Sequence, residues 1–155
     1  MVKKAKEEGK KTGLITGCFD ILHLGHIEVF RFAKKRVDIL VVGVDSDESI
    51  RISKGEKRPF NSLQKRMDFL QEISLVDYTF PIIGVIPFGS NKASKVHKSL
   101  LRKLKPDYLI TGVVADKFWK DKKKVAKELG IKFLADERRR GSESTKIIEK
   151  LEEEL

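Results

Sequence analysis

The sequence predicts an α/β protein: a doubly wound, parallel sheet of five strands with helices on both faces. Short apolar runs alternate with helical patterns along the 155 residues, an order typical of parallel sheets covered by helices. In addition, residues 39–44 are almost continuously apolar and β-branched, as in a strand buried on both faces. The length suits one domain, so we expect residues 1–155 to form a single unit.

The first half of the chain begins with a β-α-β unit. We expect a strand at 13–16, a helix at 26–36 and the buried strand at 39–44. Asn61 or Ser62 can cap a second helix, which runs to about residue 74. Its apolar residues recur at spacings of four, three and three, at Leu63, Met67, Leu70 and Ile73.

Strands and helices also alternate in the second half of the chain. A weaker third strand is expected at 78–83, followed by a loop at 84–91. Leucines and a valine between residues 96 and 104 mark a helix. The remaining elements are a strand at 108–111, a helix at 117–129 that Gly130 ends, a strand at 131–134 and a last helix at 144–155. In such sheets, ligands bind beyond the carboxyl ends of the strands.

The composition of the chain limits the classes of function that the protein can have. The chain has 33 Lys and Arg against 23 Asp and Glu, a net charge of +10, so it attracts anions: nucleic acid, an acidic membrane surface or phosphorylated substrates. No apolar run approaches the length of a membrane span. Residues 1–11 are basic and lack an apolar segment, so we interpret them as a frayed arm rather than a secretory signal. The single cysteine, Cys18, indicates a reducing, cytoplasmic location.

The segment directly after the first strand carries the clearest chemistry. Gly17 and Gly25 allow the backbone to approach a ligand, and the free amides of the following helix favour an anion. His23 and His26 are three residues apart, so their imidazoles point the same way on a first helical turn. This combination predicts a polyphosphate site.

These residues resemble a known family. The string Gly17-x-Phe19-Asp20-x-x-His23-x-Gly25-His26 resembles the signature of the cytidylyltransferase-like nucleotidyltransferases, which have an H-x-G-H motif on a Rossmann-like fold. Three further blocks match in place: Lys54-Gly55-x-x-Arg58-Pro59, Arg66 in the next helix, and residues 141–148 where the family has Ser-Thr-Thr-x-x-Ile.

The resemblance implies an enzyme in which a phosphate oxygen of a small metabolite attacks the α-phosphorus of a nucleoside triphosphate and releases pyrophosphate. It implies Mg²⁺ bound through the substrate phosphates and no covalent intermediate. His23, His26, Lys54 and Arg58 would be catalytic, and Asp20 and Asp45 would contact the substrate. The residues implied to bind the nucleotide are Gly17, Cys18, Phe19, Gly25, Arg66, Gly112, Arg138, Ser144 and Thr145.

Several of these residues also have a purely structural interpretation. Arg66 borders the apolar seam of its helix, so its guanidinium binds either a phosphate or a structural carboxylate. Phe118 and Trp119 either cover a ligand or belong to the core.

The chain also departs from the family in two places. Glu143 replaces the first Ser of the triplet, and residues 112–116 replace a Gly-x-Asp-like pattern, with Asp116 as its possible substitute.

Residues 44–67 look most like the adenylyltransferase domain of ADP-heptose synthesis, which favours ATP slightly over CTP and a heptose 1-phosphate acceptor. The adjoining classes are glycerol-3-phosphate or phosphoethanolamine cytidylyltransferases and FAD synthases. Relatives of this kind are often homodimers. Two other classes stay open: a basic nucleic-acid-binding module, which lacks a recognisable motif here, and a relative that binds nucleotide without activity.

Overall fold

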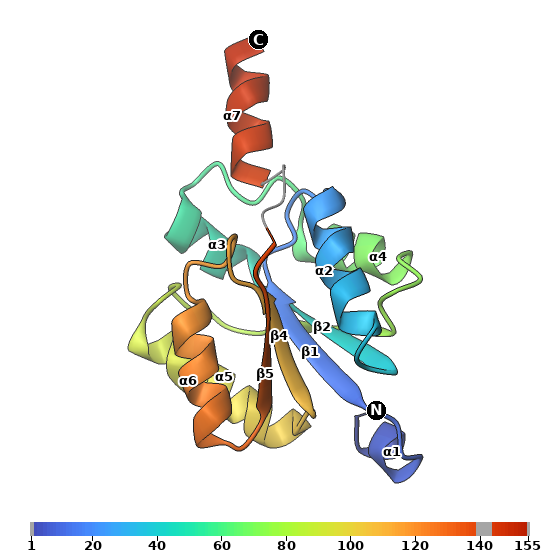
Figure 1. Cartoon of the computed structure of the whole chain (residues 1–155). Coiled ribbons are helices and arrows are strands. Elements are labelled where there is room, and N and C mark those ends of the chain that lie inside the picture. The colour runs from blue at the N-terminus through green and yellow to red at the C-terminus, as the bar shows by residue number, and fades with distance from the viewer. Residues whose placement is uncertain (1, 139–143, 155) are drawn as a thin grey trace.

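The computed structural model, which describes residues 2–138 and 144–154, contains one parallel five-stranded sheet (Figure 1). The strands lie in the order β3-β2-β1-β4-β5, so the predicted fold class is confirmed. Because β1 pairs with both β2 and β4, the strand order reverses beside β1. The strands are β1 (Thr12–Gly17), β2 (Ile39–Asp45), β3 (Tyr78–Ile82), β4 (Tyr108–Gly112) and β5 (Lys132–Asp136).

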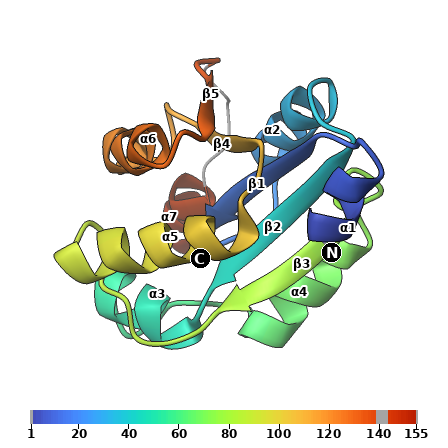
Figure 2. The ribbon, with the colours of Figure 1, turned by 90° about the horizontal axis from the view of Figure 1, so that it is seen from below.

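Helices cover both faces of the sheet, as Figure 2 shows from below. Five of them lie where the sequence predicts helices, and their ends differ from the predicted ones by at most three residues, except that α5 begins five residues earlier, at Asn91. The helices are α1 (Val2–Glu7), α2 (Leu24–Lys34), α3 (Asp47–Lys54), α4 (Leu63–Gln71), α5 (Asn91–Leu104), α6 (Trp119–Glu128) and α7 (Ser144–Glu154). Helices α1 and α3 are not among the predicted elements.

Alternate residues of the central strands divide the core into two layers. Ile15, Val42 and Ile110 pack with α2 and α4, whereas their neighbours Leu14 and Val41 pack with α1, α5 and α6. This alternation follows from the pleat of the sheet, because successive side chains of a strand point to opposite faces. All five side chains are at most 4% exposed, so both faces of the central strands are dry.

The expectation of a frayed basic arm at residues 1–11 is wrong. Residues 2–7 form α1, and its Val2 and Ala5 are buried because they lie three apart on one side of the helix. Val2 joins the core beside Leu14. The ammonium of Lys6 lies 3.3 Å from the carboxylate of Asp107. The basic sequence of α1 therefore contains a short apolar stripe, Val2 and Ala5, by which the helix packs on the rest of the protein.

Helix α3 connects β2 to the loop that carries the second basic motif. The Ser46 hydroxyl caps it by accepting a hydrogen bond from the Ser49 amide. Gly55 ends it with φ 103°, a conformation that favours glycine. Lys54 is therefore the last residue of a helix, directly before the turn at Gly55.

The positive charge is unevenly distributed over the helices. Helix α5 has five basic residues and no acidic one, and α6 has five basic and two acidic residues. Helix α1 adds three basic residues and one acidic residue. These three helices pack on the same face of the sheet, so that layer attracts anions most strongly.

Burial of Phe30 dominates the contact between α2 and the sheet. Its side chain is 0% exposed, whereas that of Phe69 on α4 is 52% exposed. We expect Phe30→Ala to lower the free energy of unfolding by about 3–5 kcal/mol, because the substitution leaves a cavity. Urea denaturation measures this effect.

The matched control is Phe69→Ala, which should change the free energy of unfolding by about 0.5 kcal/mol or less. Equal losses in the two variants would contradict the assignment of Phe30 to the core.

Candidate functional site

A cavity of about 1010 Å³ opens at the carboxyl ends of the strands. Its walls come from both helical layers and include α2, α5, α6 and the end of α3. Twelve of the fifteen residues predicted for the site line it: Gly17, Cys18, Phe19, Asp20, His23, Gly25, His26, Asp45, Lys54, Arg58, Gly112 and Arg138. The turn with the paired imidazoles and the Lys54 segment therefore share one pocket.

The two histidines of the H-x-G-H motif cap α2. Nδ1 of His23 accepts a hydrogen bond from the Gly25 amide at 3.1 Å, and Nδ1 of His26 accepts one from the His23 amide at 3.3 Å. The ring centroids lie 4.0 Å apart. Because each Nδ1 acts as an acceptor, a neutral ring carries its proton on Nε2. The caps thus fix two imidazole donors at the amino end of a helix.

Burial keeps His26 neutral in the ligand-free protein. Its pKa is lowered to about 3 by burial, with smaller contributions from the positive charge of His23 and of Lys54. The Phe19 ring packs on it with centroids 5.3 Å apart. A neutral imidazole donates a hydrogen bond without the desolvation cost of a buried cation, and an approaching polyanion raises its pKa again.

Asp20 holds the loop that carries Arg58. One carboxylate oxygen accepts from Nε of Arg58 at 2.8 Å, and the other accepts from the amides of Phe60 and Asn61, both at 2.9 Å. The Asp20 side chain is 1% exposed. These bonds occupy both oxygens, so Asp20, predicted to contact substrate, positions Arg58 instead. The Nη2 atom of Arg58 is buried without a hydrogen-bond partner within the described residues.

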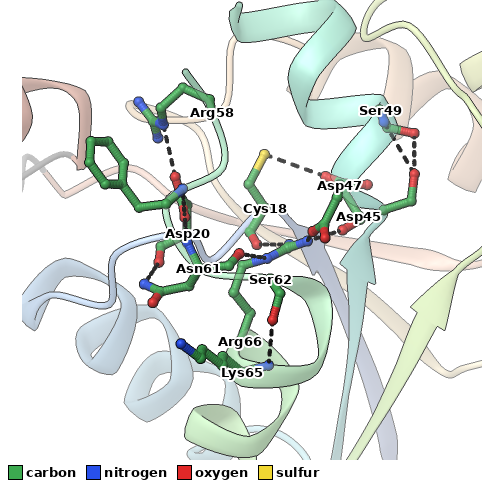
Figure 3. Close-up of polar contacts among 12 residues, drawn as sticks. Cys18, Asp20, Asp45, Asp47, Ser49, Arg58, Asn61, Ser62, Lys65 and Arg66 are labelled. Carbon is green, nitrogen blue, oxygen red and sulfur yellow. Dashed lines mark hydrogen bonds and ion pairs between the residues drawn. The ribbon is translucent and has the colours of Figure 1, made fainter. Parts of the chain in front are cut away.

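Arg66 does not face the cavity, which corrects its prediction as a phosphate-binding residue. Its guanidinium lies inside the protein with its side chain 0% exposed. It donates to the backbone carbonyls of Cys18, Asp45 and Asn61 and to the carboxylate of Asp47 at 2.6 Å (Figure 3). The four acceptors take four of the five N–H donors of the planar guanidinium. Arg66 therefore ties the ends of β1 and β2 to the turn before α4.

Cys18 and Asp45 form a weakly polar pair in the wall of the cavity. The thiol lies 3.6 Å from Oδ2 of Asp45. Burial, and then the Asp45 charge, raise the pKa of Cys18 to about 12, so the thiol is neither a nucleophile nor a metal ligand at neutral pH. Burial also raises the pKa of Asp45.

The cavity wall also contains polar residues that were not predicted for the site, among them Thr16, His97 and Lys122, and it contains Asp116, the possible substitute in the Gly-x-Asp-like pattern. The ammonium of Lys122 lies 2.6 Å from the Asp116 carboxylate and 3.3 Å from the Thr16 carbonyl. Asp116 also accepts from the Thr111 hydroxyl at 2.9 Å. A signal existed for His97, which occupies the apolar seam of α5 four residues after Ala93.

Helix α7 brings Lys146 and Glu149 to the same cavity. Its first residues, Ser144 and Thr145, were predicted to bind nucleotide; their side chains and Glu143 lie outside the described residues. Arg138 lines the cavity, and its guanidinium pairs with Asp136 at 2.8 Å.

Within the described part of the chain, no group of three or more His, Cys, Asp or Glu side chains is arranged to hold a metal ion. None of the helices described there combines the length and the apolar character that a membrane crossing needs.

The sequence and the structure have clear relatives. A family model described as cytidylyltransferase-like matches residues 14–150. The chain is 34% identical over its whole length to the bifunctional protein HldE of Sulfurimonas denitrificans. It is 40% identical, over 72% of its length, to the HldE of Chromohalobacter salexigens. It spans 30% of the first relative and 21% of the second.

Among solved structures, the chain resembles a lipopolysaccharide core biosynthesis protein from Thermoplasma volcanium. The TM-score is 0.64 at 29% identity, and the match covers 85% of this chain and all of the other. It also resembles a pantoate-beta-alanine ligase from Francisella tularensis, with a TM-score of 0.61 over 90% of this chain and 66% of the ligase. The identity of 18% makes the ligase a likeness of fold alone.

The bonds of Arg66 predict a stability effect. We expect Arg66→Met to lower the free energy of unfolding by about 3–5 kcal/mol, because the substitution leaves three carbonyls and the Asp47 carboxylate without their buried donor. Chemical denaturation followed by circular dichroism measures this loss. Lys65→Met is the matched control, since Lys65 is exposed on the same helix. A stable Arg66→Met protein that had lost only nucleotide binding would restore the phosphate-facing interpretation.

His97 predicts a pH dependence of stability. Burial, and then the charge of Lys122, lower its pKa from 6.5 to about 4. Between these values the unfolded chain binds more protons than the folded protein, so stability falls as the pH falls. From pH 7 to pH 5, we expect the native protein to lose about 2 kcal/mol more than His97→Gln. Urea denaturation at both pH values measures the difference, and parallel losses would contradict the neutral, buried imidazole.

Proposed function

The chain belongs to the cytidylyltransferase-like family, and from this premise we propose that it transfers a nucleotidyl group from ATP to a phosphorylated sugar and releases pyrophosphate. One observation carries the proposal. His23, His26, Lys54 and Arg58 line a single cavity at the amino end of α2, and the Arg58 guanidinium has a buried nitrogen, Nη2, without a partner among the described residues. Such a set of donors suits a polyphosphate and its transferring phosphoryl group.

The reaction requires no nucleophilic side chain. A phosphate oxygen of the acceptor forms a bond to the α-phosphorus, and the bond from that phosphorus to the bridging oxygen of pyrophosphate breaks. Negative charge grows on the departing pyrophosphate, where fixed donors stabilise it most. The capped imidazoles and Arg58, held by Asp20, are oriented before the ligand arrives. Catalysis then rests on positioning and electrostatic stabilisation.

A heptose phosphate is the favoured acceptor. Residues 44–67 resemble the adenylyltransferase domain of ADP-heptose synthesis, and the relatives with 34% and 40% identity carry the name HldE. The similar structure from Thermoplasma volcanium is named for lipopolysaccharide core biosynthesis. ATP, rather than CTP, accompanies this choice.

Mg²⁺ bound to the triphosphate, a cytoplasmic location and a homodimer stay predictions. We expect a Mg²⁺ ion that arrives with the nucleotide, because three carboxylates of the cavity, Asp20, Asp45 and Asp116, are separately engaged with Arg58, Cys18 and Lys122. Such an ion neutralises phosphate charge while keeping most of its ligands from phosphate and water.

The proposal is tested by measuring pyrophosphate release with each of the four triphosphates. The acceptors are heptose 1-phosphate, glycerol 3-phosphate, phosphoethanolamine and FMN. We expect turnover with ATP and heptose 1-phosphate. Turnover with glycerol 3-phosphate or phosphoethanolamine and CTP, or with FMN and ATP, would reassign the acceptor class. Stabilisation by a triphosphate with no release for any acceptor would indicate a relative that binds nucleotide without activity.

His26→Ala should lower kcat by about 10²–10³, because it removes a fixed donor to the departing pyrophosphate. Lys54→Ala should also reduce kcat/KM, since it removes the cation at the end of α3. Steady-state kinetics of pyrophosphate release measure both effects. Circular dichroism and thermal melting verify that the variants are folded.

Lys57→Ala is the control for the loop, because Lys57 is exposed and lies outside the cavity wall. Its kinetics should match those of the unmodified protein. Full turnover in a folded His26→Ala protein would remove the imidazole from the mechanism.

A further inference from the structure

The cavity has two chemically different sides. On one side stand His23 and His26, from the helix layer that contains α2. On the other side stand His97 of α5 and Lys122 of α6, which belong to the opposite layer (Figure 2). The first side gathers the donors assigned above to the triphosphate. The second side has no role in the proposed mechanism, although it is just as polar.

Two polar groups on this second side lack partners. The hydroxyl oxygen of Thr16 is buried and has no hydrogen-bond partner within the described residues, and the whole residue is 7% exposed. The imidazole of His97 faces the charges of Lys122 and Asp116, but it makes no hydrogen bond to any described residue. An unpaired buried polar group costs about 1–3 kcal/mol, so the Thr16 hydroxyl, in the same cavity wall as the half-buried imidazole of His97, points to a ligand that pairs with both.

The charges on this side nearly cancel. Lys122 is neutralised by Asp116 at 2.6 Å. Burial raises the pKa of Asp45. His97 is neutral at pH 7, because burial lowers its pKa to about 4. A phosphate would find no uncompensated cation among these residues.

Donors and acceptors are instead interleaved. A neutral imidazole offers one N–H and one bare nitrogen, a threonine hydroxyl offers both functions, and a carboxylate accepts. Sugar hydroxyls match this pattern, since each both donates and accepts a hydrogen bond.

We propose that Thr16, Asp45 and His97, with Lys122 held by Asp116, form the subsite for the hydroxyl-bearing carbon chain of the acceptor. This subsite rests on the proposed function, in which the acceptor phosphate meets the α-phosphorus of the triphosphate that the imidazoles of α2 bind. The sugar then extends from that phosphate toward α5 and α6. His97 acts as a specificity residue that contacts the sugar and not the triphosphate.

The test measures dissociation constants by calorimetry, with heptose 1-phosphate as the probe and a non-hydrolysable ATP analogue present. His97→Leu removes both hydrogen-bonding nitrogens with little change in volume. We expect the sugar phosphate to bind about tenfold more weakly or worse, because both of those hydrogen bonds are lost. The dissociation constant of the ATP analogue should stay within about twofold, and His97→Asn should recover part of the sugar affinity.

Ser99→Ala is the matched control on α5, because Ser99 is exposed and does not line the cavity; it should leave both constants unchanged. Equal weakening of both ligands by His97→Leu, or of neither, would overturn the subsite. So would a native protein that binds the ATP analogue but not heptose 1-phosphate, hexose 1-phosphate or glycerol 3-phosphate.

Failure of the proposed function is distinguishable from failure of the subsite. If only the proposed function fails, the native protein binds the sugar phosphate and His97→Leu selectively weakens that binding, but no pyrophosphate is released. Conversely, release with FMN or phosphoethanolamine but no binding of polyol phosphates would retain the transferase and eliminate the hydroxyl-binding subsite.

Discussion

The buried guanidinium of Arg66 is the constraint on which the ligand-binding end of the sheet depends. It bonds backbone carbonyls at the ends of β1 and β2 and before α4, together with the Asp47 carboxylate (Figure 3). The loops at the carboxyl end of a sheet carry function, but they have few backbone partners of their own. One planar cation with several donors satisfies carbonyls from three segments at once. The segments that present Cys18 and Asp45 to the cavity are therefore fixed relative to each other.

Around this anchor, the protein orients its ligand-binding groups with bonds that leave their working atoms available. Asp20 holds Arg58, which lines the cavity, through Nε, and the buried Nη2 has no partner among the described residues. The helix cap holds His26 through Nδ1, which assigns the proton of the neutral ring to Nε2. Each group thus has one atom for the protein and one for the ligand. Orientation before binding reduces the entropy that the reaction would otherwise lose.

How much of this arrangement the sequence predicts depends on how far apart in the chain the interacting residues lie. The strands and the histidine turn follow from local patterns: apolar runs, glycines and the spacing of His23 and His26. Helix α3 also has local signals, with Ser46 as its cap and Gly55 at its end, so the sequence is sufficient to predict it. The docking of α1 was harder to foresee, because only Val2 and Ala5 mark its apolar side.

The orientation of a long side chain is not encoded locally. Arg66 borders the apolar seam of α4, and the same pattern fits a guanidinium that points outward to a phosphate or inward to carbonyls. Only the tertiary positions of Cys18, Asp45 and Asn61 decide in favour of the interior. The position of His97 is likewise decided by the tertiary structure. The pattern of α5 places His97 on the apolar side of the helix, but the strand order reverses beside β1, and the cavity that opens there has His97 in its wall. Because β1 lies between the two directions of winding, helices from both layers meet at one opening. In the proposed transfer, the acceptor oxygen attacks the α-phosphorus on the side opposite to the departing pyrophosphate, and this topology supplies separate walls for the acceptor and the triphosphate.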